Sequence, residues 1–141
     1  MSDLRAELDA WCQSYVAAFN KEDADAIAAH WTFPAVTTQK GRSFSFKSAE
    51  HFAKNTGLLL GFYRAQRVHR VERRIEDVLS LHRDAVSMTV ADAMFTDDGT
   101  EIVHWQAAYV LQRIDGQWKA VMAVADGETD AWVAHGTPLG G

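Results

Sequence analysis

The sequence has a single cysteine, few basic residues and no long apolar run. Cys12 stands alone, so an intrachain disulfide is excluded and nothing favours an oxidising compartment. The 14 lysines and arginines are outnumbered by 19 aspartates and glutamates, and the net charge of −5 argues against a nucleic-acid-binding surface. The longest apolar stretch, around residues 57–63, is far too short to cross a membrane. The acidic, amphipathic N-terminus does not have the pattern of a signal peptide, so we expect a cytoplasmic protein.

Sequence motifs for metals, nucleotides and nucleophilic catalysis are also missing. The six histidines, at positions 30, 51, 69, 82, 104 and 135, form no HExxH or HxH pattern and have no companion cysteine. There is no P-loop, no GxGxxG and no GxSxG. We therefore expect no metal site and no cofactor.

The composition and the apolar periodicity predict one domain, residues 1–141, that begins with helices. A hydrophobic content of 48% in 141 residues is enough for a genuine core. A first helix is predicted over 3–19, where apolar residues recur every three or four positions, a second over 24–31, ended by Pro34, and a third that starts after Ser48. A final helical turn is expected over 129–135.

The remaining segments read as strands. A short hairpin is predicted from 36–39 and 42–46, and a long strand with a bulge from 68–81. Three further strands, 86–95, 101–113 and 118–126, are joined by Asp98-Gly99 and Asp115-Gly116, which are both signals for two-residue turns. The predicted fold class is α+β, a strongly curved antiparallel sheet with the N-terminal helices packed on its concave face.

The two turns also predict which side chains face the core. If both turns hold, Asp92, Trp105 and Asp126 share one cross-strand row, and Met88, Tyr109 and Met122 share another. The face that carries these rows is otherwise apolar. A carboxylate there costs free energy unless something uses or pairs it, so the pattern indicates a pocket that contains Asp92 and Asp126.

Two segments resemble the NTF2-like superfamily, in its SnoaL-like and ketosteroid-isomerase-like branch. They are YVAAFNKEDADAIAAHW, residues 15–31, and YVLQRIDGQWKAVMAV, residues 109–124, and the likeness extends over nearly the whole chain. The resemblance implies a cone-shaped α+β barrel. It does not fix the chemistry, because this fold hosts isomerases, cyclases, dehydratases and non-catalytic binders.

The resemblance also implies roles for particular residues. Tyr15 matches the tyrosine that donates to the oxyanion in ketosteroid isomerases, whereas Gln39 stands where that family has its general-base aspartate. An amide cannot abstract a proton, so ketosteroid isomerisation itself is not expected. The family's protonated aspartic acid, which completes the oxyanion hole, falls at about Tyr109. The likeness to SnoaL-like proteins implies instead an acid or base on the sheet, for which Asp126 and Asp92 are the candidates.

These residues suggest a small enzyme that moves a proton next to a carbonyl group, as an isomerase, cyclase or dehydratase does. Asp126, Asp92 and Tyr15 are the predicted catalytic residues. The predicted lining for a small apolar substrate consists of Tyr109, Trp105, Trp31, Met88, Met122, Phe19 and Gln39.

Structural explanations of the same residues stay open. Asp126 precedes Gly127 and could lie in water at a strand end, and Asp92 could form an ion pair with Arg73 or Arg74. Tyr15 could be an ordinary core residue. The alternative function is a non-catalytic ligand-binding or dimerisation module. The opposite face of the sheet carries small apolar residues, from which we expect a homodimer formed through that face.

Overall fold

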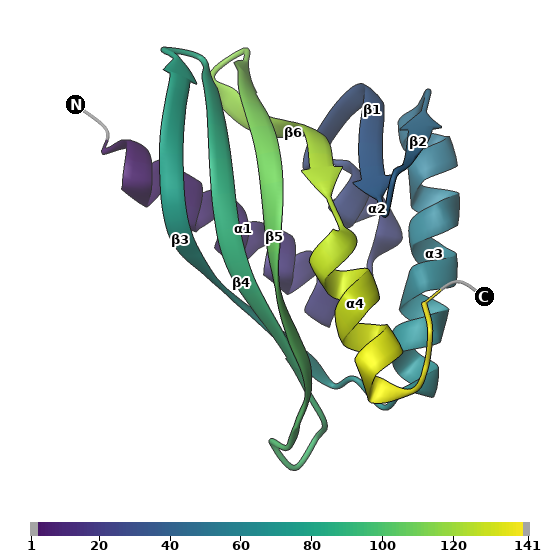
Figure 1. The fold of residues 1–141 in the computed structure, drawn as a ribbon. Helices are drawn as coiled ribbons and strands as arrows, with labels where there is room; N and C mark the ends of the chain where they lie inside the picture. Colours follow the sequence, from purple (N-terminus) through teal and green to yellow (C-terminus); the bar gives the residue numbers. More distant parts are fainter. Residues whose placement is uncertain (1–2, 140–141) are drawn as a thin grey trace.

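The computed structural model describes residues 3–139, which form four helices and six strands (Figure 1). The helices are α1 (Leu4–Asn20), α2 (Ala24–Ala28), α3 (Ala49–Ala65) and α4 (Asp126–His135). The strands are β1 (Trp31–Gln39), β2 (Arg42–Phe46), β3 (Arg70–His82), β4 (Ala85–Phe95), β5 (Glu101–Ile114) and β6 (Gln117–Val124).

All six strands belong to one curved, unclosed sheet in the order β2-β1-β6-β5-β4-β3. Neighbouring strands are antiparallel except β1 and β6, which run parallel. Figure 1 shows α1 crossing one side of β3, β4 and β5, with α3 beside β1 and β2. The predicted α+β class is therefore confirmed.

Helices α1, α2 and α3 begin at side-chain caps, whereas α4 has none. Asp3, Asp23 and Ser48 accept hydrogen bonds from the backbone N–H groups of Arg5, Ala26 and His51. The apolar stripe of α1 faces the sheet and is buried at Leu8, Trp11, Cys12 and Tyr15. The predicted first and third helices are confirmed.

The second helix is shorter than predicted. It ends at Ala28, and Trp31 is instead the first residue of β1. The backbone N–H of Ala120 donates to the carbonyl of His30, and Trp31 lies opposite Ala120 of β6. Pairing with a distant strand thus replaces the last helical turn, and Pro34 lies inside β1.

The predicted pairing of β4 with β5 is confirmed. Asp92 lies opposite Trp105, and Met88 lies opposite Tyr109. The turn itself differs, because Gly99 has a positive φ of 88° while Asp98 does not. The loop runs from Thr96 to Thr100, and the Asp98 carboxylate accepts hydrogen bonds from both threonines. An irregularity beside the loop pairs Phe95 with Glu101, and from Met94 onward the predicted alignment holds.

The predicted pairing of β5 with β6 holds only near the turn. Asp115 and Gly116 have φ of 52° and 79°, as the predicted turn requires. A bulge then shifts the alignment between Val110 and Leu111.

The shift corrects two predictions for the inner face. Tyr109 lies opposite Ala123, and Met122 lies opposite Val110 on the other face. The predicted row of Met88, Tyr109 and Met122 is therefore wrong at Met122. The row of Asp92, Trp105 and Asp126 is wrong at Asp126, since β6 ends at Val124 and Asp126 starts α4.

Helix α4 continues from the end of β6 and packs against the first half of β5 (Figure 1). Trp132 on α4 is fully buried and packs against Phe62 and Tyr63 of α3. Gly127 allows this close approach, because a Cβ atom there would overlap the backbone carbonyl of Gln106. In residues 3–139 we find no helix long and apolar enough to span a membrane.

Replacing Gly127 by alanine is expected to destabilise the protein by about 1–3 kcal/mol, since the added methyl group forces α4 away from β5. Urea denaturation measures the loss. Gly57→Ala is the matched control, because Gly57 lies in α3 with no atom within 4 Å of the new methyl group. It should be neutral or stabilising by up to about 1 kcal/mol. Equal effects of the two substitutions would contradict this account of α4.

Candidate functional site

The interior of the curved sheet contains an ion pair between Arg73 on β3 and Asp92 on β4. Their side chains are only 5% and 4% exposed. Nε and Nη2 of Arg73 donate to the two carboxylate oxygens of Asp92 at 2.7 and 2.8 Å. The inward position of Asp92 is thus confirmed, and so is the alternative that it pairs with an arginine. Such bidentate, charge-assisted pairs are roughly twice as strong as neutral hydrogen bonds.

Aromatic side chains surround the guanidinium of Arg73. Nη2 also donates to the Tyr109 hydroxyl at 2.8 Å, and the group lies over the rings of Tyr109 and Tyr15 at 4.6 and 5.3 Å. Burial acts against the charged form, but Tyr109 and Asp92 outweigh it and hold the pKa of Arg73 above its ordinary value. The third nitrogen, Nη1, is buried and has no hydrogen-bond partner within the described part of the chain.

Two phenols converge beside this pair. The Tyr15 hydroxyl accepts a hydrogen bond from Nε1 of Trp31 at 3.0 Å, and the Tyr109 hydroxyl accepts the one from Arg73. The two rings meet edge to face at 6.2 Å. Burial raises the pKa of both tyrosines, so both remain protonated at neutral pH. Each hydroxyl therefore keeps its own hydrogen for donation.

A second carboxyl group lies nearby, at Glu128 in the first turn of α4. The Tyr63 hydroxyl and Nε1 of Trp132 both donate to its Oε2 atom. Burial raises the pKa of Glu128 from 4.5 to about 7, even though both hydrogen bonds lower it. Asp92 raises this pKa and Arg73 lowers it, which places Glu128 within electrostatic reach of the ion pair.

A cavity of about 200 Å³ opens where the C-terminal ends of α1 and α3 meet the start of β3. Its lining consists of Phe19, Asn20, Glu22, Leu60, Tyr63, Arg64, Val68, His69 and Val71. The Asn20 amide exchanges two hydrogen bonds with the backbone of Val71, which fixes α1 to β3. Tyr63 belongs both to this cavity and to the Glu128 cluster, so it connects the two.

Most of the predicted site residues lie in or next to this interior. Trp105 lies opposite Asp92, Met88 is buried beside Cys12, and Trp31 binds Tyr15. Phe19 lines the cavity, and its ring packs edge-on against Tyr15 at 5.1 Å.

Three predicted residues lie elsewhere. Met122 is on the other face of the sheet, and Gln39 is the last residue of β1 at the β1–β2 turn. Asp126 is half-buried at the start of α4 and acts electrostatically on Lys40. The structure therefore does not bring Asp126 into a row with Asp92.

Sequence reasoning missed Glu128 and Tyr63. Glu128 fell between the predicted end of β6 and the predicted helix at 129–135, so it was assigned to no element. Tyr63 lay in the part of α3 where Gly57 and Gly61 weaken the helical pattern. The signal that could have revealed Glu128 was its spacing from Trp132. If the final helix is extended to include Glu128, the two residues lie one turn apart on the same face.

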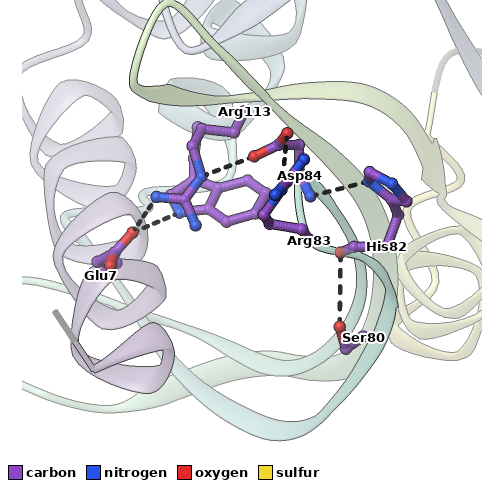
Figure 2. Close-up of polar contacts among 7 residues, drawn as sticks. Glu7, Ser80, His82, Arg83, Asp84 and Arg113 are labelled. Carbon is purple, nitrogen blue, oxygen red and sulfur yellow. Dashed lines mark hydrogen bonds and ion pairs between the residues drawn. The ribbon is translucent and has the colours of Figure 1, made fainter. Parts of the chain in front are cut away.

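A third polar cluster lies at the other end of α1 (Figure 2). Glu7 accepts hydrogen bonds from Arg113 at 2.9 Å and from Nε1 of Trp118 at 3.0 Å, and Arg113 also contacts Asp84 at 3.4 Å. These partly exposed contacts join α1 to β5 and β6, although Nε of Arg113 has no hydrogen-bond partner among the residues described. Among residues 3–139, no three His, Cys, Asp or Glu side chains are grouped to hold a metal ion.

The raised pKa of Glu128 predicts how stability changes with pH. Between pH 4.5 and about 7 the folded protein holds this proton while the unfolded chain has released it, so stability falls as the pH rises. Relative to Glu128→Gln, which has no such proton, the wild type should lose on the order of 2 kcal/mol from pH 4.5 to pH 8. Urea denaturation of both proteins at several pH values measures the difference. Parallel curves would contradict the predicted burial of a neutral Glu128.

Comparison with protein-family models assigns a family to this architecture. The model described as "NTF2-like protein (DUF6841)" matches residues 6–128. No match was found among curated proteins.

Solved structures share the fold at low sequence identity. Aln2 from a Streptomyces species has a TM-score of 0.72 at 13% identity, covering 91% of this chain and 93% of its own. A domain of unknown function with a cystatin-like fold from Nostoc punctiforme has a TM-score of 0.68 at 15% identity, covering 88% and 77%. A ketosteroid isomerase-like protein from Erwinia carotovora atroseptica has a TM-score of 0.63 at 18% identity, covering 88% and 95%.

The sequence resemblance, the observed fold and the family match agree. Because the family model spans most of the sequence, this chain belongs to the NTF2-like protein family.

Proposed function

We propose that this protein binds a small apolar molecule with a carbonyl group and transfers a proton to or from it, in a reaction of the isomerase, cyclase or dehydratase type. The observation that carries the proposal is the Glu128 carboxyl. Its pKa of about 7 is the value that serves a general acid or base best at neutral pH. Tyr63, which donates to Glu128, also lines the 200 Å³ cavity.

This assignment moves proton transfer from Asp92 and Asp126 to Glu128. Both oxygens of Asp92 are engaged by Arg73, so Asp92 is a poor proton acceptor while the pair is intact. In our proposal Asp92 instead holds Arg73 in place. Asp126 lies at the start of α4, two residues before Glu128, and remains the rival carboxylate.

The phenols supply the complementary role. Tyr15 and Tyr109 each accept a hydrogen bond and retain a free O–H, so both can donate to a developing enolate oxygen. Phe19 lies between the cavity and Tyr15, with its ring 5.1 Å from that of the tyrosine. A substrate must displace the Phe19 side chain to reach the phenol. The apolar walls suit a flat, mostly hydrophobic molecule.

A specific observation favours a second candidate, a non-catalytic binding protein. The cavity of about 200 Å³ is smaller than the 300–1,000 Å³ typical of ligand pockets, and the Arg73–Asp92 pair is closed on itself. In that case the cavity would hold a small apolar group and the ion pair would only support the sheet.

The homodimer stays a prediction, and the outer face of the sheet offers some support for it. Leu79 on β3 and Val124 on β6 are 62% and 36% exposed. Leu79 lies opposite Ser87 and Val124 lies opposite Ala108, so both belong to the face of small residues. A second copy of the chain would cover these side chains.

The experiment combines ligand binding with proton exchange. A panel of small cyclic ketones and enones is screened by thermal shift, and binders are then followed in deuterated buffer by proton NMR. The wild type should exchange the hydrogens next to the carbonyl, and Glu128→Gln should slow this exchange at least about 100-fold without losing binding. Glu101→Gln, an exposed glutamate on β5, is the matched control and should exchange at the wild-type rate.

The other outcomes separate the alternatives. Binding without exchange in the wild type would favour the binding protein. Exchange that survives Glu128→Gln but is lost in Asp126→Asn would return the role to Asp126. Neither binding nor exchange across the panel would contradict the proposal for this class of substrate.

A further inference from the structure

A second concavity, separate from the interior site, lies beside the first half of α1. It has a volume of about 420 Å³ and runs between α1, the end of α2 and the start of β6. Its lining consists of Glu7, Ala10, Trp11, Ser14, Ala29, His30, Gln117, Trp118 and Lys119. None of these residues lines the cavity proposed above for the carbonyl substrate.

A serine and a histidine in this groove are arranged as a nucleophile and its base. Nδ1 of His30 lies 2.7 Å from the carbonyl oxygen of Ala26, which can only accept, so Nδ1 bears the hydrogen. In the neutral ring Nε2 is then an acceptor. It lies 2.8 Å from the hydroxyl of Ser14, which therefore donates to it. Serine nucleophiles are activated in this way, when a base accepts the hydroxyl hydrogen and a third group holds the base in position.

The surroundings keep the base in the form it needs. Burial lowers the pKa of His30, and Lys119 lowers it further against the opposing effect of the Ala26 carbonyl. The imidazole is therefore neutral at neutral pH and free to accept a proton. Ser14 itself is exposed on α1, so a reagent in solution can reach it.

An unused hydrogen-bond donor lies in the same lining. The Trp11 side chain is 7% exposed, and its Nε1 has no hydrogen-bond partner among the residues described. Its ring packs edge-on against His30 at 5.8 Å. A buried N–H without a partner is uncommon in folded proteins. Because this one has almost no exposed surface, an acceptor oxygen on a molecule bound in the groove would reach it only if the Trp11 ring shifted.

We propose that this groove is an acyl-transfer site for small esters, with Ser14 as the nucleophile and His30 as the general base. The Ser14 oxygen bonds to the ester carbonyl carbon while its proton passes to Nε2 of His30. The carbon–oxygen bond to the leaving alcohol then breaks, and His30 returns the proton to that alcohol. Water then attacks the acyl carbon while His30 takes its proton. The bond from this carbon to the Ser14 oxygen breaks, His30 returns the proton to Ser14, and the acid leaves.

A serine near another histidine provides an internal comparison (Figure 2). The Ser80 hydroxyl donates to the backbone carbonyl of His82 at 3.5 Å, and the His82 ring accepts from the backbone N–H of Asp84. The Ser80 oxygen therefore gains no base from its histidine. Ser80 is exposed, as Ser14 is, so the two serines differ in activation rather than in access.

The test is covalent labelling of the full chain with a fluorophosphonate, which forms a serine–phosphorus bond and releases fluoride. We expect one label per chain, located at Ser14 by peptide mass spectrometry, and at least about tenfold less label on Ser80. Ser14→Ala should abolish the labelling, and His30→Gln should slow it at least about tenfold. Ser80→Ala should leave it unchanged.

Hydrolysis of p-nitrophenyl acetate and thermal unfolding of each variant complete the experiment. Wild type and Ser80→Ala should release p-nitrophenol with a burst of about one equivalent, which Ser14→Ala should lack. Equal labelling of Ser14 and Ser80 in the wild type would overturn the proposal without any variant. The proposal would also be overturned if His30→Gln melted at a lower temperature but was labelled at the wild-type rate. His30 would then only join α1 to the end of α2.

Discussion

The buried contact between Arg73 and Asp92 is the constraint on which the interior of this protein depends. Removing two opposite charges from water is costly, and close pairing offsets that cost, as it does here although Nη1 of Arg73 has no partner among residues 3–139. The alignment of β3 with β4 places these residues directly opposite each other. Tyr109 reaches the guanidinium from β5, and the ring of Tyr15 covers it from α1. Contacts with this one ion pair thus connect four elements, β3, β4, β5 and α1.

The ion pair also determines what chemistry the interior can offer. Because Asp92 is committed to Arg73, the carboxyl with an adjustable proton is Glu128, which belongs to the C-terminal helix. This helix can approach the sheet only because Gly127 has no side chain, and Trp132 anchors it against α3. The position of the proposed acid or base therefore depends on backbone packing between α4 and β5. The Arg73–Asp92 pair thus holds the interior together, while Glu128 on a separate helix carries the exchangeable proton. This division is consistent with the many functions that the fold supports.

The sequence was informative wherever local rules determine structure. The Asp98-Gly99 signal predicted the alignment of β4 with β5 from Met94 to Ala85, and so the inward position of Asp92 and its row with Trp105, although the turn itself differs from the predicted one. Apolar spacing predicted α1, and the cap at Ser48 predicted the start of α3. Arg73 was one of two arginines considered as partners for Asp92, and choosing it required the bulge and alignment of β3.

Features set by distant contacts could not be predicted. The bulge between Val110 and Leu111, which turns Met122 outward, follows from pairing β6 with both β5 and β1. Trp31 leaves its predicted helix for the same reason, since β6 supplies its backbone partner. Glu128 becomes half-buried only when α4 packs against Tyr63, a contact between residues 65 positions apart. The sequence therefore located the region of the proposed site but not Glu128, its proposed acid or base.

A double-mutant cycle on Arg73 and Asp92 tests the central claim most directly, with urea denaturation measuring the stability of Arg73→Met, Asp92→Leu and the double variant. Each single substitution leaves one buried charge without its partner and should cost about 3–5 kcal/mol. The double variant, which removes both charges together, should cost much less than the two losses combined. Losses that simply add would contradict the account, because they would show that the two side chains contribute independently and that no buried ion pair organises the interior.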